Sequence, residues 1–354
     1  MDVETIVAEP VRVEPLAAAQ TSEETARARI FELGFSWTVP RALHVAAELG
    51  VADAIGDQPK SVEQIAAATD SHAPSLGRLL RLLVKHEVFD QDGEGRIRLN
   101  EVSRLLRADT PGSMRDFLRF DNDVMWSAYG GLPHTVKTGV PGFDHVHGRS
   151  FFDYLMSDME GARRVDGAQL SLSVPEEKVI PRVYDFSAAG SICDLGGGRG
   201  GLLTEILLAS PDARGVLYDQ PQVVEQPERL REAGLLDRCS VVAGDFFGSV
   251  PAGHDLYVLK RVLHDWDEEK SIRILRNVRQ AMDEDARLLV IEGIVRSEDT
   301  ESLVRECDIS IMTFLTGRIR SKEEFLALFG ATGFKLLRIV PATSLVSVME
   351  LRKS

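Results

Sequence analysis

Five short apolar runs in the C-terminal half of the chain constrain its fold more than any other feature. They begin after Pro181, and the segments between them, including Glu268–Met282 before the fifth run, have helix-like patterns or lengths. Strands that alternate with helices build a mainly parallel sheet covered on both faces. We therefore predict an α/β fold with strands at Ser191–Leu195, Gly215–Tyr218, Ser240–Ala243, Leu256–Leu259 and Arg287–Ile291, and a terminal hairpin over Phe334–Val340 and Leu345–Leu351.

A glycine-rich loop joins the first predicted strand to a helix over Leu202–Ala209. Its Asp-x-Gly-x-Gly-x-Gly pattern consists of Asp194, Gly196, Gly198 and Gly200. Glycines let the backbone approach a ligand closely, and a helix N-terminus favours an anion. The spacing differs from the Gly-x-Gly-x-x-Gly of dinucleotide sites, and the opening acid suits an ammonium group but would repel a pyrophosphate. The amino-acid end of S-adenosylmethionine carries both an ammonium and a carboxylate, so this loop is a candidate site for that cofactor.

Acidic residues also end the next two predicted strands. Asp219 ends the second strand, where a carboxylate can accept hydrogen bonds from both hydroxyls of a ribose. Asp245 and Phe246 follow the third strand, where they can accept from an adenine amino group and stack on the base. Each acid alone fits a helix cap or a turn equally well. Three acids at the ends of three consecutive strands meet at the edge where such sheets bind ligands, and together they predict a nucleoside site.

The N-terminal part of the chain has a different pattern. Residues 1–20 show no clear period and are expected to form a disordered tail. Ser22–Glu48 is helical in pattern but too apolar for an exposed helix, so we expect burial against another subunit or within the chain. Residues 61–99 predict a winged helix, because two helices precede a short hairpin. The two helices are Val62–Ala68, with Ser61 and Gln64 as a capping box, and Ser75–His86.

A winged helix is also a common DNA-reading module, and basic residues share one face of its second helix. These are Arg78, Arg81 and Lys85. The formal net charge of −14, however, opposes a polyanionic partner such as nucleic acid or an anionic membrane. We therefore interpret this face as solvated and expect no nucleic acid as a partner.

Composition argues against several further kinds of site. The opening residues lack a secretory leader and no apolar run is long enough to span a membrane, so we expect a cytoplasmic location and no membrane partner. Cys193, Cys239 and Cys307 are too few and too widely spaced for a disulfide framework or a four-ligand zinc site. His145 and His147 form a His-x-His pair, but no carboxylate or cysteine cluster accompanies them. No metal site is expected.

With these features together, the chain resembles the class I methyltransferases, and most closely the O-methyltransferase family of plant caffeate-type and bacterial natural-product tailoring enzymes. The resemblance covers roughly residues 25 to 350, and its most specific pieces are Asp194-Leu-Gly-Gly-Gly-Arg-Gly200, Tyr218-Asp-Gln-Pro-Gln-Val-Val224, Gly244-Asp-Phe-Phe247 and Leu259-Lys-Arg-Val-Leu-His-Asp-Trp266. It implies a seven-stranded, mainly parallel Rossmann-like sheet and an N-terminal α-helical winged-helix domain. That domain would form a homodimer and close the substrate pocket instead of binding DNA. S-adenosyl-L-methionine is the implied cofactor and S-adenosyl-L-homocysteine its product, with contacts from Gly196, Asp219, Asp245, Phe246 and Lys260.

The segment Val262-Leu-His-Asp-Trp266 carries the chemistry that this resemblance implies. Methyl transfer is an in-line displacement, so the enzyme must align the acceptor and make it nucleophilic. His264 stands just beyond the fourth strand, and an imidazole there can take the proton of a phenol, whose pKa is about 10. The resemblance implies that Glu292, at the end of the fifth strand, orients His264. The family's second orienting acid falls at position 319, which is Ile319 in this chain, so one carboxylate is missing.

The resemblance also implies where the acceptor binds, although core packing explains each of these residues at least as well. The candidates are aromatic and methionine side chains that can sandwich a planar ring, and one acid: Trp126, Phe152, Met156, Asp308 and Met312. The chain then divides into the tail at 1–20, a winged-helix dimerisation domain at 21–110, a helical linker and substrate-pocket region at 111–180, and a cofactor-binding methyltransferase domain at 181–354.

The sequence therefore predicts methyl transfer from S-adenosylmethionine to a hydroxyl, which we expect to be phenolic, on a small aromatic secondary metabolite. Nitrogen stays open as the acceptor atom, because amine methylation needs much the same cofactor site. Ile319 motivates one alternative, a methyltransferase-like enzyme that keeps the cofactor but catalyses decarboxylation, hydroxylation or rearrangement. The winged helix over 61–99 motivates a more distant one, a ligand-responsive DNA-binding regulator.

Overall fold

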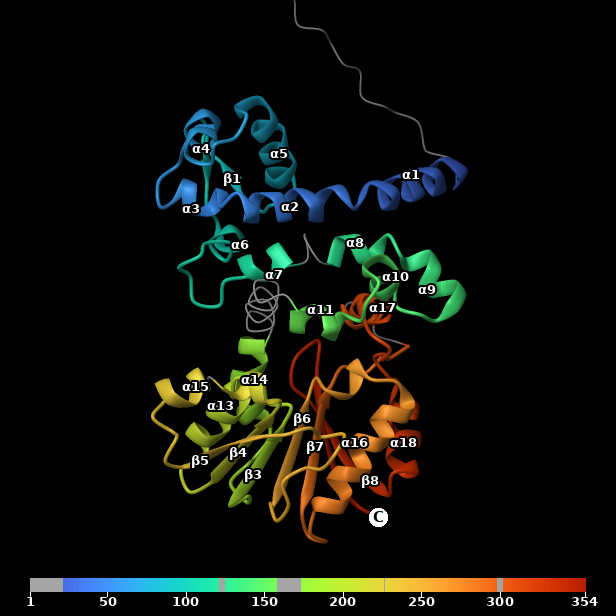
Figure 1. The fold of residues 1–354 in the computed structure, drawn as a ribbon. Helices are drawn as coiled ribbons and strands as arrows, with labels where there is room; N and C mark the ends of the chain where they lie inside the picture. The colour runs from blue at the N-terminus through green and yellow to red at the C-terminus, as the bar shows by residue number, and fades with distance from the viewer. Residues whose placement is uncertain (1–21, 121–124, 158–172, 226, 298–301) are drawn as a thin grey trace, which may run out of the picture.

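The structure is a computed structural model that describes residues 22–120, 125–157, 173–225, 227–297 and 302–354. Figure 1 shows a small N-terminal helical domain, a middle layer of short helices, and a sheet with flanking helices, stacked one above the other. The tail expected over residues 1–20 lies outside the described residues. The seven-stranded, mostly parallel sheet and the separate N-terminal helical domain confirm the predicted fold class.

The N-terminal domain has the predicted order of two helices and a hairpin. Ser61 Oγ accepts from the Gln64 N–H and the Gln64 side chain accepts from the Ser61 N–H, which confirms the capping box. The second helix begins at Ala73, before the predicted Ser75, because Pro74 fits a first helical turn whose N–H groups need no partner in the helix. The domain's elements are α1 (Ser22–Phe35), α2 (Thr38–Glu48), α3 (Val51–Ile55), α4 (Val62–Ala68), α5 (Ala73–Lys85), β1 (Asp90–Gln91), β2 (Ile97–Arg98) and α6 (Glu101–Arg104).

Helix α1 extends away from the rest of the N-terminal domain (Figure 1). The helical segment predicted over Ser22–Glu48 is divided near Trp37, and only its second part, α2, has buried residues. Ile30 and Phe31 on α1 are 72% and 69% exposed. Among the described residues, nothing in the chain buries these two side chains, so the expectation of burial within the chain is wrong for them. Burial against a second subunit is the expectation that remains.

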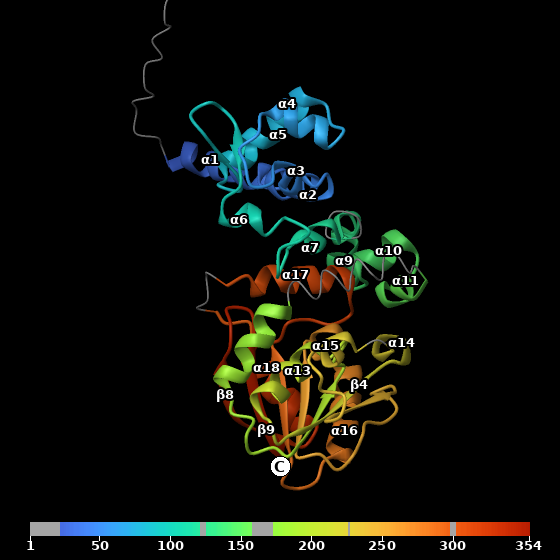
Figure 2. The ribbon, with the colours of Figure 1, turned by 90° about the vertical axis from the view of Figure 1, so that its left-hand side faces the viewer.

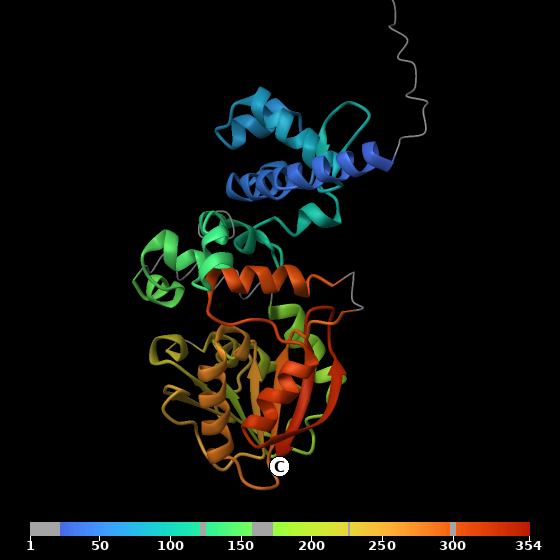
Figure 3. The same ribbon diagram turned by 90° about the vertical axis from the view of Figure 1, so that its right-hand side faces the viewer.

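Short helices form a layer between the N-terminal domain and the sheet. Helix α17 (Val304–Phe314) comes from the C-terminal part of the chain, yet it contacts helices from the middle of the chain within this layer (Figures 2 and 3). Phe143, Phe151 and Phe314 join the two parts in one aromatic cluster. The other helices of the layer are α7 (Arg115–Phe120), α8 (Trp126–Tyr129), α9 (Leu132–Thr138), α10 (Gly142–His147) and α11 (Phe151–Ser157).

The sheet has the strand order β5-β4-β3-β6-β7-β9-β8. The first five strands in that order run parallel, and the C-terminal hairpin joins them antiparallel at one edge. All seven predicted strands are confirmed to within about two residues. Their bounds are β3 (Ser191–Leu195), β4 (Arg214–Asp219), β5 (Cys239–Ala243), β6 (Leu256–Lys260), β7 (Arg287–Glu292), β8 (Phe334–Pro341) and β9 (Ser347–Lys353).

Helices cover both faces of the sheet, as predicted. One face carries α16 (Glu268–Ala281) and α18 (Lys322–Ala331). The other carries α13 (Gly201–Ala209), α14 (Pro221–Val224), α15 (Glu228–Glu232) and the helical residues 173–183. The helix-like segment expected between β5 and β6 is wrong. Residues 244–255 form turns and loop, because Gly248, Pro251 and Gly253 interrupt any helix there.

The strand order reverses beside β3, and this reversal positions the site. From β3 the chain moves outward to β4 and β5, and then returns to place β6 on the other side of β3. Loops that leave two such neighbouring strands in opposite directions open a crevice at the carboxyl ends of the strands. The glycine loop follows β3 and the turn that carries His264 follows β6, so both lie at this crevice. Within the described ranges, no helix is both long and apolar enough to cross a membrane.

Candidate active site

The loop after β3 has the backbone that its glycines predict. Gly196, Gly198 and Gly200 all have left-handed backbones, with φ of 68°, 58° and 81°. A Cβ on Gly196 would lie 2.9 Å from Cγ2 of Val262, so a larger residue there would collide with the turn after β6. The loop therefore needs glycine both for its conformation and for the close approach of the two segments.

Asp194, at the end of β3, is a buried acid with an unsatisfied oxygen. Its side chain is 1% exposed, and Oδ2 has no hydrogen-bond partner among the described residues. Burial, together with the nearby charges of Asp219 and Glu177, outweighs the opposing charge of Lys260 and raises the pKa of Asp194 to about 7. A buried carboxyl without a partner is costly unless a ligand satisfies it. An ammonium group fits this position.

Asp219 is held against the same glycine loop. Its Oδ2 accepts from the Gly198 N–H at 2.9 Å and its Oδ1 accepts from the Gln220 N–H at 2.7 Å. Burial outweighs these two backbone hydrogen bonds, so the pKa of Asp219 is raised above its usual value. Each carboxylate oxygen has a second lone pair, so the side chain can still accept from a pair of hydroxyls.

Asp245 and Phe246 follow β5 at the next position along the sheet edge. Asp245 Oδ1 accepts from the Phe247 N–H at 2.8 Å, which makes it a turn acid in the described contacts. Asn277 on α16 donates to the Phe246 carbonyl at 2.8 Å and so fixes this turn to the helix below it. The three acids predicted for a nucleoside site thus lie at the carboxyl ends of β3, β4 and β5.

Lys260 lies at the end of β6, and its side chain is directed to the helix over residues 173–183. Its Nζ lies 3.1 Å from Ser173 Oγ and 3.3 Å from a carboxylate oxygen of Glu176. Lys260 also acts on Asp194, since its charge lowers the pKa of that acid. The resemblance implied a direct cofactor contact for Lys260, and in the described contacts its ammonium is shared between protein groups.

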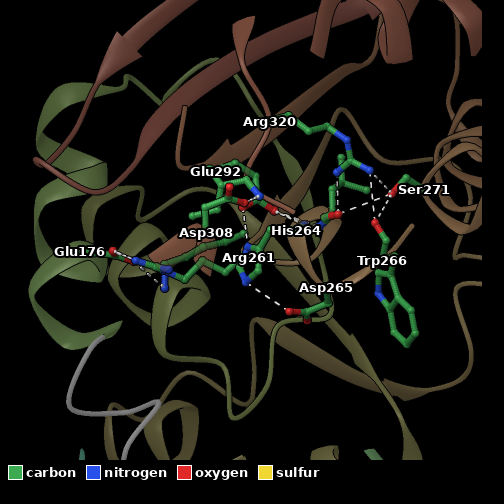
Figure 4. A network of polar contacts seen from close by, with 12 residues as sticks. Glu176, Arg261, His264, Asp265, Trp266, Ser271, Glu292, Asp308 and Arg320 are labelled. Carbon is green, nitrogen blue, oxygen red and sulfur yellow. Dashed lines mark hydrogen bonds and ion pairs between the residues drawn. The ribbon is translucent and has the colours of Figure 1, made fainter. Parts of the chain in front are cut away.

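His264 lies on a short 3-10 turn, Leu263–Asp265, directly after β6 (Figure 4). Its Nδ1 lies 2.6 Å from Glu292 Oε2, and Glu292 Oε1 accepts from the backbone N–H of Leu263 at 2.8 Å. Its Nε2 lies 3.2 Å from Asp265 Oδ1. The imidazole is therefore held between two carboxylates.

The pKa values of this group follow from its burial and its neighbours. Burial alone would lower the pKa of His264, but the charges and hydrogen bonds of Glu292 and Asp265 outweigh it and raise the pKa to about 10. For Glu292, burial favours the protonated acid, but the charge of His264 outweighs it and lowers the pKa. In this arrangement His264 is an imidazolium at neutral pH, and Asp265 takes the ring nitrogen that an acceptor hydroxyl would need.

Ile319, where the family's second acid falls, is buried beside the histidine. With Arg261, His264 and Gly293 it lines a cavity of about 30 Å³. That volume suits a single water, far below the several hundred Å³ of a typical ligand pocket. Asp308 on α17, predicted as a substrate residue, accepts from the backbone N–H of Ile319 at 2.8 Å.

The other predicted acceptor residues are spread over the middle layer. Phe152 stacks on Trp266 at a centroid distance of 5.1 Å, two residues beyond His264. Trp126 packs against Trp37 and beneath Arg41 of the N-terminal domain. Met312 is half-buried on α17. Met156 belongs to α11, but its side chain lies outside the described residues. The structure thus brings Phe152 to the His264 turn.

Sequence reasoning missed the residues that hold this turn in place. Arg320 is 1% exposed and donates to the carbonyls of Leu263 and Trp266 and to Ser271 Oγ. Arg261 forms an ion pair with Glu176 at 2.5 Å (Figure 4). The Gly317-Arg-Ile-Arg-Ser321 segment was the available signal, but the residue types alone do not separate the buried Arg320 from its exposed neighbour Arg318. No group of three or more potential metal ligands occurs within the part of the chain that the structure describes.

Two parts of this chain match models of known protein families. Residues 129–335 match the family model of the O-methyltransferase domain, and residues 31–109 match that of the O-methyltransferase dimerisation domain. The second match covers the region in which a DNA-reading winged helix was the alternative.

Similar proteins align with this chain over most of their length. The phenazine O-methyltransferase PhzM of Lysobacter antibioticus is 39% identical over 89% of this chain and 92% of its own. The phenazine-1-carboxylate N-methyltransferase of Pseudomonas aeruginosa is 36% identical over 85% of this chain and 89% of its own. The structure of the mitomycin 7-O-methyltransferase MmcR has a TM-score of 0.87 at 36% identity, covering 94% of this chain and 99% of that one. An O-methyltransferase from neocarzinostatin biosynthesis, solved with S-adenosylmethionine and 2-hydroxy-5-methyl naphthoic acid, has a TM-score of 0.78 at 33% identity over 90% and 96% of the two chains.

Proposed function

We propose that this chain, which belongs to the O-methyltransferase family, moves a methyl group from S-adenosylmethionine to a phenolic hydroxyl of an aromatic secondary metabolite. The observation that carries the proposal is the unsatisfied, buried Asp194 oxygen beside Asp219, at the crevice that also holds the His264–Glu292 pair. A cofactor with an ammonium, a ribose and an adenine matches three acids at the ends of three neighbouring strands. The relative solved with S-adenosylmethionine and a naphthoic acid supports both the cofactor and the aromatic acceptor.

Each residue of the cofactor site has a proposed task. Asp194 accepts from the ammonium group, and the left-handed backbones of Gly196, Gly198 and Gly200 let the loop approach the amino-acid end closely. Asp219 accepts from the ribose hydroxyls. Asp245 accepts from the adenine amino group, and Phe246 stacks on the base. When bound, S-adenosylmethionine supplies an electrophilic methyl group on a sulfonium.

The acceptor's proton is assigned to Nε2 of His264. Asp265 occupies that nitrogen at 3.2 Å, so an acceptor hydroxyl must take the place of Asp265. With Asp265 displaced, one of the two carboxylates that raise the pKa of the ring is lost, and His264 releases its proton to solvent before the transfer. An oxygen–methyl bond then forms as the sulfur–methyl bond breaks, while the hydroxyl proton passes to Nε2 of the neutral imidazole. Glu292 keeps the ring oriented through Nδ1 and stabilises the imidazolium that results. Arg320 holds the turn at its Leu263 carbonyl.

A methyl-labelled cofactor tests the proposed reaction and its alternatives together. We expect a panel of phenols and anilines to give a product that carries the label on oxygen, identified by mass spectrometry and NMR. Label on nitrogen would assign the chain to the chemistry of its N-methyltransferase relative. An unlabelled product of changed mass would favour the second candidate, a different tailoring reaction, which Ile319 in place of an acid motivates.

The affinity for S-adenosylhomocysteine should depend on pH through Asp194. The pKa of this acid is raised to about 7 in the protein without ligand, so below that pH it must lose a proton to receive the ammonium. We expect the affinity to rise about tenfold per pH unit from roughly pH 5 towards 7 and then to level off. At more alkaline pH the ligand's own amino group loses its proton, so the affinity falls again.

Isothermal titration calorimetry over this pH range measures the effect, and buffers of different ionisation enthalpy count the released proton. Asp194→Asn is the matched control, because it should bind more weakly and without the rise. Equal affinity at pH 5.5 and 7.5 in the wild type would exclude Asp194 as the ammonium acceptor.

A homodimer through the N-terminal domain belongs to the same proposal. It is supported by the match to a dimerisation domain and by the exposed apolar side chains of α1, among them Ile30 and Phe31. We expect Phe31→Asp to convert a dimer into a monomer in analytical ultracentrifugation, because a charge buried at an apolar interface is costly. Leu208→Asp on α13 is the control, since it places the same charge at an exposed apolar residue of another domain. A Phe31→Asp protein that stays dimeric would move the interface elsewhere.

A further inference from the structure

Glu176 is a buried carboxylate that lies between two cations at the end of β6. Its side chain is 3% exposed and comes from the helix over residues 173–183. One oxygen lies 2.5 Å from an Arg261 nitrogen, and the other lies 2.9 Å from Arg261 Nε and 3.3 Å from Lys260 Nζ. Burial alone would raise the pKa of Glu176, but Arg261 and Lys260 outweigh it and lower the pKa. Glu176 is therefore ionised and shared by both cations.

The two cations face opposite ends of the active site. Lys260 acts on Asp194, at the cofactor end, and lowers the pKa of that acid. Arg261 acts on Glu292, the partner of His264, and lowers the pKa of that acid. Arg261 also has a left-handed backbone, with φ of 54°, at the point where the chain leaves β6 for the His264 turn. A left-handed backbone is energetically unfavourable for a residue other than glycine, so we infer that the contacts of the Arg261 side chain hold this conformation in place.

A charge series thus runs through the site: Asp194, Lys260, Glu176, Arg261, Glu292 and His264, with alternating signs (Figure 4 shows the last four). Removing one member of a buried ion pair leaves the other without compensation, at a large cost. Without Glu176, Lys260 would turn to the two carboxylates that its charge already reaches, Asp194 and Glu177, and Arg261 would turn to Glu292. The proposed function needs Asp194 and Glu292 for other partners.

We propose that Glu176 is a positioning residue that keeps Lys260 away from Asp194 and Arg261 away from Glu292. Asp194 then stays available to the cofactor's ammonium, and Glu292 stays fully paired with His264. The inference rests on the proposed function for the roles of those two acids. The new element is that one carboxylate, Glu176 from a helix outside the sheet, controls which partners are available to Asp194 at one end of the site and to Glu292 at the other.

The charged groups around His264 make the effect of Glu176 specific. Glu292 faces the ring from β7, Asp265 from its own turn, and Arg261 reaches Glu292 from the end of β6. Arg320 comes from the segment after α17 and binds the turn's backbone, and its charge interacts with Glu292. Asp308 on α17 faces the same region through the Ile319 backbone. Only Arg261 among these groups is paired with Glu176.

The variant Glu176→Gln tests the proposal with two readouts that a merely structural role would not move. Calorimetry with S-adenosylhomocysteine at pH 8 should show affinity reduced about tenfold, because Lys260 competes with the ammonium for Asp194. NMR of the imidazole should show His264 titrating about one pH unit lower than in the wild type. The reason is that Arg261 would pair with Glu292 and weaken the interaction of Glu292 with the imidazolium. The conservative Glu176→Asp keeps the charge at shorter reach and should restore part of both values.

Glu177→Gln is the matched control, because it removes the neighbouring buried carboxylate, whose pKa is raised by burial and whose Oε2 has no hydrogen-bond partner among the described residues. It should leave the titration of His264 unchanged. Wild-type values for both readouts in a folded Glu176→Gln would overturn the inference. If that variant does not fold, wild-type values in Glu176→Asp would overturn it, since the shorter side chain cannot reach both cations equally. If the wild-type protein binds no S-adenosylhomocysteine, that result would contradict the proposed function itself.

Discussion

Replacing His264 by alanine is expected to lower kcat by about 10²- to 10⁴-fold, the usual contribution of a positioned general base. The KM for S-adenosylmethionine should change little, because the proposed cofactor contacts lie after β3, β4 and β5 while His264 follows β6. The effect should be this large because His264 lies at the crevice and is oriented by a buried carboxylate, Glu292 at 2.6 Å. Steady-state kinetics with any accepted phenol measures it.

The exposed His86 at the end of α5 is the control, and His86→Ala should turn over at the wild-type rate. Turnover within a few-fold of the wild type in His264→Ala would contradict the base assignment. Catalysis would then rest on proximity alone, as the missing acid at Ile319 allows.

The titration of His264 can be followed separately from turnover. Since Glu292 and Asp265 raise its pKa to about 10, its ring should stay protonated through neutral pH in the protein without ligand. The folded pKa exceeds the unfolded value of about 6.5, so this group's stabilisation is complete below about pH 6.5 and is lost as pH rises towards 10. NMR titration of the ring and urea unfolding at pH 6.5 and 9.5 check both statements. A ring that titrates near pH 6.5 would contradict the two-carboxylate arrangement.

Replacing Arg320 by methionine is expected to lower the free energy of unfolding by about 3 kcal/mol. The buried guanidinium donates to the carbonyls of Leu263 and Trp266 and to Ser271 Oγ, and its loss leaves these acceptors unsatisfied. Because the same bonds fix the turn that carries His264, kcat should fall as well, by roughly tenfold or more. Urea unfolding and steady-state kinetics measure the two effects.

Arg318→Met provides a matched comparison two residues earlier in the chain. Arg318 is half exposed, and its ion pairs to Glu268 and Glu324 are longer than 3 Å and solvent-accessible, so the change should stay within about 0.5 kcal/mol. Equal destabilisation by the two substitutions would show that the buried contacts of Arg320 do not hold the turn.

The sheet could be predicted because its signals are local. The runs from Ser191 and Arg287 are apolar and short, so each is buried on both faces, and glycines or acids mark their ends. The helix expected between β5 and β6 was wrong because segment length was read as helical although Gly248, Pro251 and Gly253 interrupt it. The break at Trp37 was missed because helical periodicity continues across it.

Only those site residues could be predicted whose place in the site follows from their position at the end of a strand. Asp194, Asp219 and Asp245 are found from sequence because each ends a parallel strand, and parallel strands end at one edge. The pairing of Glu176 with Arg261 joins residues 85 positions apart, and that of Arg320 with Leu263 joins residues 57 apart. No spacing rule links such pairs, and an exposed Arg318 has the same residue type as a buried Arg320. The contact between His264 and Asp265 was not inferred because it depends on the local 3-10 turn.

The most direct test of the central claim is a calorimetric titration of the wild-type protein with S-adenosylmethionine and S-adenosylhomocysteine near pH 7.5. We predict one site per chain with a Kd in the micromolar range, about −8 kcal/mol, weakened at least tenfold in Asp219→Ala. Asp212→Ala, an exposed acid before the opposite end of β4, should bind as the wild type does. No binding of either ligand by a folded wild-type protein, or equal binding by Asp219→Ala, would contradict a cofactor site at the ends of β3, β4 and β5.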